Sequence, residues 1–339
     1  MVNPPKEFID AHHHFLDVNK NDFQTFLGTL VPGEVYMPDA YQRDVVDPLA
    51  GAGVNVIGSV HIECMPDNGV GEVAWVDSLS STVKAIVASC DLSKSTADTD
   101  LLHLKQSSSK VRGIRWILDC VGPFKPNTAT HVATTRHDGV DYLRGSNGGY
   151  DGNVVPAFEH GFALLEKHGL SFDLQCAPVQ LKQAASLFKK YPNIKVCIDH
   201  LGKPKTLLGP DTETNTNTIP NEAELAEWRE GMKLMAALPN VYVKLSMLGW
   251  SVPGWIRNSE RISLVRGLVV ETVKLFGPQR CMVATNWWKA AALSDSDGHS
   301  DVGPTPVELI EYLTEFLSEF SDQDREDMFS GTASAFYRI

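Results

Sequence analysis

The chain has 339 residues, and its 42 Asp and Glu outnumber its 30 Lys and Arg, which gives a formal net charge of −12. An acidic balance of this size argues against nucleic acid or an anionic membrane as the main partner. The hydrophobic share of 43% is enough to fill a large core. A barrel of alternating strands and helices takes roughly 250 residues plus insertions, so we expect residues 1–339 to form a single domain.

Cysteine usage and hydropathy indicate the compartment. No run approaches the roughly 18 consecutive apolar residues that a membrane helix needs, and the N-terminus MVNPPKEFIDAHHHF lacks the apolar core of a signal peptide. The cysteines are widely scattered, with no CxxC pair that would suggest a metal or redox motif. We therefore expect free thiols, a cytoplasmic location and no membrane partner.

Short apolar or β-branched runs alternate with longer segments along the whole chain. Such runs are typical of strands in a fully buried sheet. There are eight of them, at 7–15, 55–63, 85–92, 111–118, 171–176, 195–200, 241–246 and 281–287.

The segments between these runs have helical spacing of apolar residues. The clearest predicted helices are 154–167, 179–190, 223–238 and 264–276, each followed by Gly, Pro or Asn, and 306–320 and 323–335 follow the last strand. Strands that alternate with helices imply a parallel sheet, and eight such units favour closure into a (β/α)8 TIM barrel. An open doubly wound sheet is the alternative, but it usually has a glycine-rich phosphate turn where this chain has His12-His13-His14.

Two insertions interrupt this rhythm. Residues 122–153 follow the fourth predicted strand and residues 203–221 follow the sixth. Both loops leave the carboxyl ends of strands, where barrel active sites are built. We interpret them as substrate-covering loops, with tolerated surface decoration as the alternative.

The first predicted strand ends in three histidines. His12 and His14 should point to one side of the strand, while His13 should point to the helix layer or the surface. Two imidazoles at the mouth of a barrel can share a divalent metal or polarise a carbonyl oxygen.

Other predicted strands also end in functional groups. His61 and Glu63 are expected on one face at the end of the second strand, and Asp199-His200 ends the sixth. Burying a neutral polar group without a partner costs on the order of 2–7 kcal/mol, and burying an unpaired charge costs more. The gathering of such groups at strand ends therefore predicts a functional site rather than an ordinary core. Arg112 should face away from Arg115 and serve a structural network. The remaining candidates are Arg115, Gln175, Ser246 and Asn286 at the ends of the fourth, fifth, seventh and eighth strands.

Tryptophans follow two of these strand ends. Trp287 and Trp288 come directly after Asn286, and Trp250 and Trp255 follow the seventh strand. Aromatic side chains on such loops can stack on a sugar or aryl ring, or can anchor the loops in the core.

These motifs together resemble a known family. DAHHHFLD, SVHIE, VRGIRWIL, IDHLGKP, VKLSML and the closing GTASAFYRI are similar, in order and spacing, to the amidohydrolase-2 group of predicted metal-dependent barrel hydrolases. The resemblance extends from Phe8 to Ile339. Its pattern is nearest to lactonases that open fuconolactone, rhamnonolactone or pyrone dicarboxylates, and more distant to metal-dependent aromatic-acid decarboxylases.

The resemblance implies roles for individual residues. The paired histidines of the first strand correspond to His12 and His14, and the histidine of the sixth strand to His200. The cation three positions later corresponds to Lys203, and the arginine of the fourth strand to Arg115. Many members carry Asp in the eighth strand, where it activates water and can bind the metal, but this chain has Asn286.

Asn286 changes the expected chemistry. An amide cannot accept a proton as a carboxylate does, so Asn286 would orient a water, and His200 is the first candidate for the base, with Asp199 or Glu63 behind it. With fewer anionic ligands, His12, His14 and His200 should hold Zn²⁺ or Mn²⁺ weakly or not at all.

We therefore expect a lactonase that acts on a sugar, aromatic or pyrone-type lactone, working as a monomer or homodimer. His12, His14, His200 and Asn286 would be catalytic. A metal-dependent aromatic-acid decarboxylase and a non-catalytic small-molecule binder are the alternatives. The expected substrate-binding residues are Arg115, Lys203, Glu63, His61, Gln175 and Trp287.

Overall fold

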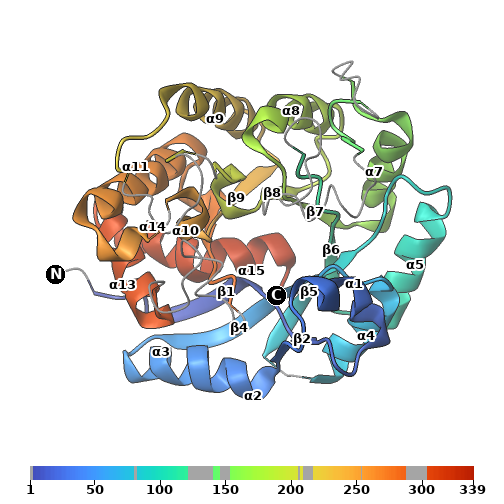
Figure 1. Cartoon of the computed structure of the whole chain (residues 1–339), viewed down its shortest axis with the longest axis horizontal. Coiled ribbons are helices and arrows are strands. Elements are labelled where there is room, and N and C mark those ends of the chain that lie inside the picture. The colour runs from blue at the N-terminus through green and yellow to red at the C-terminus, as the bar shows by residue number, and fades with distance from the viewer. Residues whose placement is uncertain are drawn as a thin grey trace.

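Eight parallel strands form the centre of the molecule in a computed structural model of the chain (Figure 1). The structure describes residues 3–79, 82–120, 140–145, 153–204, 207–208, 217–252, 254–287 and 304–339. The strand order is β1-β4-β5-β6-β7-β8-β9-β10, so each barrel strand pairs with the next barrel strand along the chain. The strands are β1 Glu7–His13, β4 Asn55–Ile62, β5 Val83–Ser89, β6 Val111–Arg115, β7 Ser171–Leu174, β8 Val196–Ile198, β9 Val241–Leu245 and β10 Cys281–Val283.

Residues just beyond β10 join the last strand to the first. The amide of Asn286 donates to the carbonyl oxygen of His12 at 2.7 Å, and the amide of His14 donates to that of Trp287 at 3.3 Å. His13 and Trp287 form a parallel bridge. The (β/α)8 TIM barrel predicted from the sequence is confirmed.

Helices surround the barrel (Figure 1). The predicted helix of 264–276 begins earlier, at Ser259, because the side chain of Asn258 accepts hydrogen bonds from the amides of Glu260 and Arg261 and caps the helix. A short antiparallel pair, β2 Leu16–Asp17 and β3 Val35–Tyr36, precedes the second barrel strand. The helices are α1 Thr25–Leu30, α2 Pro38–Tyr41, α3 Asp47–Gly51, α4 Gly69–Leu79, α5 Ala97–Ser107, α7 Pro156–His168, α8 Leu181–Lys190, α9 Glu222–Ala236, α10 Leu248–Ser251, α11 Ser259–Phe276, α13 Pro306–Phe316, α14 Asp322–Glu326 and α15 Thr332–Tyr337.

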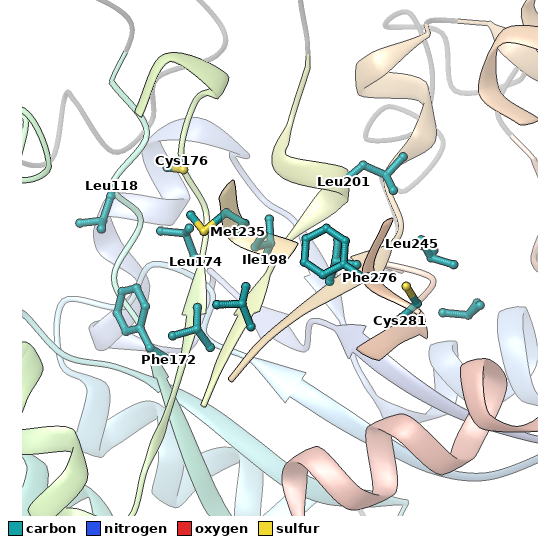
Figure 2. Packing of buried hydrophobic residues seen from close by; sticks show 14 of the residues in the cluster. Leu118, Phe172, Leu174, Cys176, Ile198, Leu201, Met235, Leu245, Phe276 and Cys281 are labelled. Carbon is teal, nitrogen blue, oxygen red and sulfur yellow. The ribbon is translucent and has the colours of Figure 1, made fainter. Parts of the chain in front are cut away.

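The main hydrophobic core fills the space between strands and helices (Figure 2). Phe172 and Leu174 of β7 and Ile198 of β8 contribute to this layer, together with Met235 of α9 and Phe276 of α11. Residues on the opposite faces of the strands fill the inside of the barrel. This inner cluster contains many small and branched side chains, among them Ala11, Val60, Ala85 and Cys197.

The C-terminal helix α15 closes the amino-terminal end of the barrel. Phe336 and Tyr337 join the inner cluster, and the Phe336 ring packs on Tyr242 near the start of β9. Arg338 donates to the carbonyl oxygen of Gly169, just before β7. The carboxyl ends of the strands lie at the opposite end, where the candidate site residues are found.

The cysteines and the two insertions can be placed in part. All six cysteines are buried and free, as the sequence predicted. Within the described residues, no helix combines the length and apolar character required to cross a membrane. Most of the insertion at 122–153, and residues 205–206 and 209–216 of the second, lie outside the described residues, as does Trp288.

Candidate active site

Three histidines meet at the carboxyl end of the barrel. Nε2 of His12 lies 3.2 Å from Nε2 of His14, and the rings of His12 and His200 have centroids 4.7 Å apart. His12 and His14 come from the end of β1, and His200 comes from the turn after β8. None of the three is more than 8% exposed.

The backbone adopts unusual conformations to bring these side chains together. The pairing of β1 with β4 shifts register between Asp10 and His13, and this irregularity lets the end of β1 turn His12 into the barrel. His200 and Asn286 have φ angles of 55° and 53°. Left-handed conformations of residues other than glycine are costly, and they concentrate at functional sites.

Asp10 holds the segment before Asn286 in place through hydrogen bonds. Its carboxylate accepts hydrogen bonds from the amide of Thr285 at 2.9 Å and from the hydroxyl of Thr285 at 2.6 Å. The hydroxyl of Tyr41 donates to the same carboxylate at 2.8 Å. Asn286 is thereby held with Oδ1 3.1 Å from Nε2 of His14.

Arg115 ties several of the predicted residues together at the end of β6. Its Nε donates to Glu63 Oε1 at 2.7 Å, and its Nη2 donates to the carbonyl oxygen of Glu63 at 2.6 Å. Its Nη1 lies 3.3 Å from Asp199 Oδ2 and 3.4 Å from Gln175 Oε1. Because most of its donors are engaged, the guanidinium holds the cluster together and has little capacity left to grip a substrate carboxylate.

Two further predicted residues, Lys203 and Ser246, follow β8 and β9. Lys203 is 3% exposed and forms an ion pair with Asp119. Nδ1 of His200 lies 2.9 Å from the hydroxyl of Ser246, which follows β9. The predicted residues from the ends of β1, β4, β6, β7, β8, β9 and β10 are thus brought together.

His61 is placed differently from the sequence-based expectation. It does not share a face with Glu63: its Nε2 lies 3.8 Å from Glu72 of α4, and its ring stacks on Phe15. The chain leaves the strand after Ile62, so the alternation that would put His61 and Glu63 on one face no longer applies. A substrate contact by His61, which is fully buried behind the cluster, is not supported by this geometry.

Three other residues of the sequence-based interpretation also lie away from the three histidine rings. His13 is fully buried against Tyr41 and Phe15, on the helix side of β1 and not at the surface. Arg112 faces away from the site, as expected, and donates to the carbonyl oxygen of Ser109. The backbone of Trp287 borders the site, and its side chain is partly buried against the main core.

The sequence-based reasoning missed a buried ionic network beneath the histidines. Lys244 of β9 has Nζ 2.6 Å from Asp173 Oδ2, 2.9 Å from Asp199 Oδ1 and 3.2 Å from His12 Nδ1. Tyr337 of α15 donates to Asp173 Oδ2 at 2.7 Å. The available signal was a single Lys in VYVKLS and a single Asp in SFDLQC, each inside an otherwise apolar strand, where a lone charge could not be buried.

Burial and neighbouring charges set the protonation of the site. Burial holds the pKa of His12 and of His14 well below the ordinary value, and it lowers the pKa of His200 to about 3. All three imidazoles are therefore neutral near pH 7. Burial alone would raise the pKa of Asp199, but the ammonium of Lys244 outweighs it and holds that pKa well below its usual range.

Three of these side chains could offer ligand atoms to a metal ion. Within the described residues, His12, Asp199 and His200 offer ligand atoms within 4.8 Å of one another; Asp199 takes the place expected for His14. Lys244 contacts both His12 Nδ1 and Asp199 Oδ1, and Arg115 contacts Asp199 Oδ2. Because two cations already engage these lone pairs and would repel a dication, the group does not fit a firmly held divalent ion.

A (β/α)8 barrel with an ionisable cluster at the carboxyl ends of its strands has the arrangement of barrel enzymes. The chain belongs to the amidohydrolase family, whose model matches residues 9–339. It is 27% identical to L-fucono-1,5-lactonase of Burkholderia ambifaria, over 98% of this chain and 95% of that protein.

Solved structures with the same fold include two from bacteria. An amidohydrolase from Burkholderia multivorans with bound zinc is 21% identical, with a TM-score of 0.68 over 98% of this chain and 99% of that one. A probable 2-pyrone-4,6-dicarboxylic acid hydrolase from Acinetobacter baumannii is 13% identical, with a TM-score of 0.60 over 98% of this chain and 99% of that one.

Proposed function

We propose that this protein hydrolyses a lactone, by attack of water on the ring ester carbonyl. The observation that carries the proposal is the meeting of three neutral, buried imidazoles, of His12, His14 and His200, beside two buried cations. The resemblance to L-fucono-1,5-lactonase supports a lactone over an amide substrate.

The chain's own residues account for the steps of this reaction. His12 lies at the centre of the cluster, where a ring N–H can stabilise the negative charge that develops on the carbonyl oxygen. His200 is neutral and can accept a proton from the attacking water, and it can return that proton to the ring oxygen as the ester C–O bond breaks. Its low pKa would rise as the oxyanion forms beside it, because a nearby negative charge favours the imidazolium.

Asn286 and Arg115 serve this reaction by orientation. Asn286 can position the water through its amide, and Arg115 keeps Glu63 and Gln175 in place at the rim. We propose that a divalent metal is held weakly or not at all, since Arg115 and Lys244 already compensate Asp199. Lactones open readily as activated esters, so a site of this kind suits them better than it suits amides.

Acid release in weak buffer, with a panel of sugar, aromatic and pyrone-type lactones, tests the proposal. We expect the wild-type protein to release acid from at least one lactone and His200→Asn to lose roughly 10²–10⁴-fold in turnover. His160→Asn is the matched control, because His160 is exposed on α7, and it should keep wild-type turnover. If His200→Asn retained near-normal turnover, the role of His200 would be wrong.

A further inference from the structure

We propose that Lys244 fixes the ring tautomer of His12, so that His12 presents an Nε2–H donor to the substrate instead of a bare, metal-binding nitrogen. Lys244 is then a positioning residue, because it acts through His12. The inference deepens the proposed lactone hydrolysis and takes its catalytic meaning from it. The protonation pattern itself rests only on hydrogen-bond contacts.

The first set of contacts is made by the ammonium of Lys244. Its partners are Asp173 Oδ2 at 2.6 Å, Asp199 Oδ1 at 2.9 Å and His12 Nδ1 at 3.2 Å. An ammonium has three N–H bonds and no lone pair, so it can only donate to each of them. Nδ1 of His12 is therefore the bare nitrogen that accepts from Lys244, and a neutral ring with a bare Nδ1 carries its proton on Nε2. Nη1 of Arg115 also lies 3.4 Å from Nε2, but its two hydrogens have Asp199 Oδ2 at 3.3 Å and Gln175 Oε1 at 3.4 Å as acceptors.

A second contact leads independently to the same result. Nδ1 of His14 lies 2.8 Å from the carbonyl oxygen of Ile62, and a carbonyl oxygen can only accept, so Nδ1 of His14 carries the proton. Nε2 of His14 is then bare, and it lies 3.2 Å from Nε2 of His12. One partner of this contact must donate, and only His12 has the proton to do so. Asn286 Oδ1 lies 3.1 Å from the same nitrogen, and an amide oxygen only accepts, so the bare Nε2 of His14 requires the amide of Asn286 to be turned with its NH2 toward this nitrogen.

This tautomer is the opposite of the one that binds a metal through Nε2. A ligating histidine binds through a bare nitrogen and donates its other N–H, often to a carboxylate. Asp199 Oδ1 lies 3.5 Å from His12 Nδ1 and could accept such a bond. Lys244 is the nearer partner of His12 Nδ1, at 3.2 Å. Lys244 therefore determines whether His12 presents an N–H for an oxyanion or a bare nitrogen for a metal.

Lys244 is itself held in place from below. It is fully buried, and Tyr337 of α15 donates to Asp173 Oδ2 at 2.7 Å while its ring lies 5.7 Å from Nζ of Lys244. The C-terminal helix that closes the barrel thus supports the residue that orients His12. Since Asp173 and Asp199 both contact the ammonium, its position does not depend on His12.

Nitrogen NMR of the protein labelled with 15N-histidine reads the tautomers directly, with His12→Gln and His14→Gln used to assign the signals. We expect His12 to be neutral with its proton on Nε2, and His14 to be neutral with its proton on Nδ1. A His12 that carries its proton on Nδ1, or on both nitrogens, would overturn the inference, even if lactones are hydrolysed. If the tautomers are as expected but the protein hydrolyses no lactone, the inference about Lys244 stands and the proposed function is contradicted.

A charge-neutral pair of substitutions tests the role of Lys244. Lys244→Met with Asp173→Asn removes one charge of each sign, so the net charge of the network is unchanged. We expect the proton of His12 to move to Nδ1, toward Asp199, and the affinity for zinc to rise by about tenfold or more. An unchanged tautomer or an unchanged zinc affinity in the folded variant would overturn the inference. Lys195→Met is the matched control, because Lys195 is exposed at the amino end of β8, and it should change neither quantity.

Discussion

Replacing Arg115 by Met should lower the free energy of unfolding, because it leaves the buried carboxylate of Glu63 without its cation. The guanidinium is 3% exposed and makes its two shortest contacts to Glu63, at 2.7 Å to Oε1 and 2.6 Å to the carbonyl oxygen. Asp199 would still be paired with Lys244 at 2.9 Å, but Glu63 would lose its cation. Removing one partner of a buried ion pair costs about 3–5 kcal/mol.

The size of this effect can be converted into a melting temperature. For 339 residues the entropy of unfolding is about 0.7 kcal/mol/K, so the loss corresponds to a fall in Tm of about 4–7 °C. Scanning calorimetry measures it. Glu63→Gln combined with Arg115→Met should recover part of the stability, since both charges then leave together.

Arg112→Met is the matched control on the same strand. Arg112 is half-buried on the opposite face and contacts the carbonyl oxygen of Ser109, so the same substitution there should cost about 0.5 kcal/mol or less and leave turnover unchanged. Equal losses in the two variants, or a larger loss for Arg112→Met, would refute the assignment of the two arginines to opposite faces.

Three further outcomes are expected. Tyr337→Phe removes the 2.7 Å hydrogen bond to Asp173 and should lower the free energy of unfolding by about 1.5–3 kcal/mol in urea titrations, with a loss below about 0.5 kcal/mol speaking against it. Because burial lowers the pKa of His200 to about 3 in the folded protein, below its unfolded value, His200 causes stability to fall as pH drops from about 6.5 toward 3. His200→Asn should reduce that slope by up to about 1.4 kcal/mol per pH unit in denaturant unfolding at several pH values, and an unchanged slope would mean that His200 is charged. Asn286→Asp places a carboxylate about 3.1 Å from Nε2 of His14, so it should raise the pKa of His14. In competition titrations the variant should bind zinc about tenfold more tightly or better, and an unchanged zinc affinity would contradict the role given to Asn286 in weakening the metal site.

The barrel could be predicted from the sequence because its signals are local. Each strand is a short buried run, and the clearest predicted helices are followed by a Gly, Pro or Asn that favours a helix end, as at Gly169, which has a φ of 65°. The start of α11 was missed by five residues, since it is set by a side-chain cap at Asn258 and not by the apolar periodicity.

The candidate site was predictable only as far as strand alternation holds. Polar groups at the ends of buried strands stand out in the sequence, and this signal identified His12, Glu63, Arg115 and His200. Their mutual contacts could not be predicted, because these depend on the register shift in β1 and on the φ of 55° at His200. The position of His61 went wrong where the strand ends and alternation no longer applies.

The partners of Lys244 could not be read from the sequence. Asp173, Asp199 and Tyr337 lie on three different elements, far apart along the chain, and only the closed barrel brings them to one ammonium. A lone Lys in a buried strand indicates that a partner must exist, since an unpaired ammonium is too costly there, but it does not say which residue that is.

Metal-free hydrolysis of a lactone is tested by acid release from the lactone panel, with protein that has been treated with chelator and analysed for bound metal. We expect a metal-depleted sample with native fold to open at least one lactone at the same rate as the untreated sample. Loss of activity on chelation, restored by stoichiometric zinc, would contradict the metal-independent role given to His12. Absence of acid from every lactone would contradict the lactonase proposal itself.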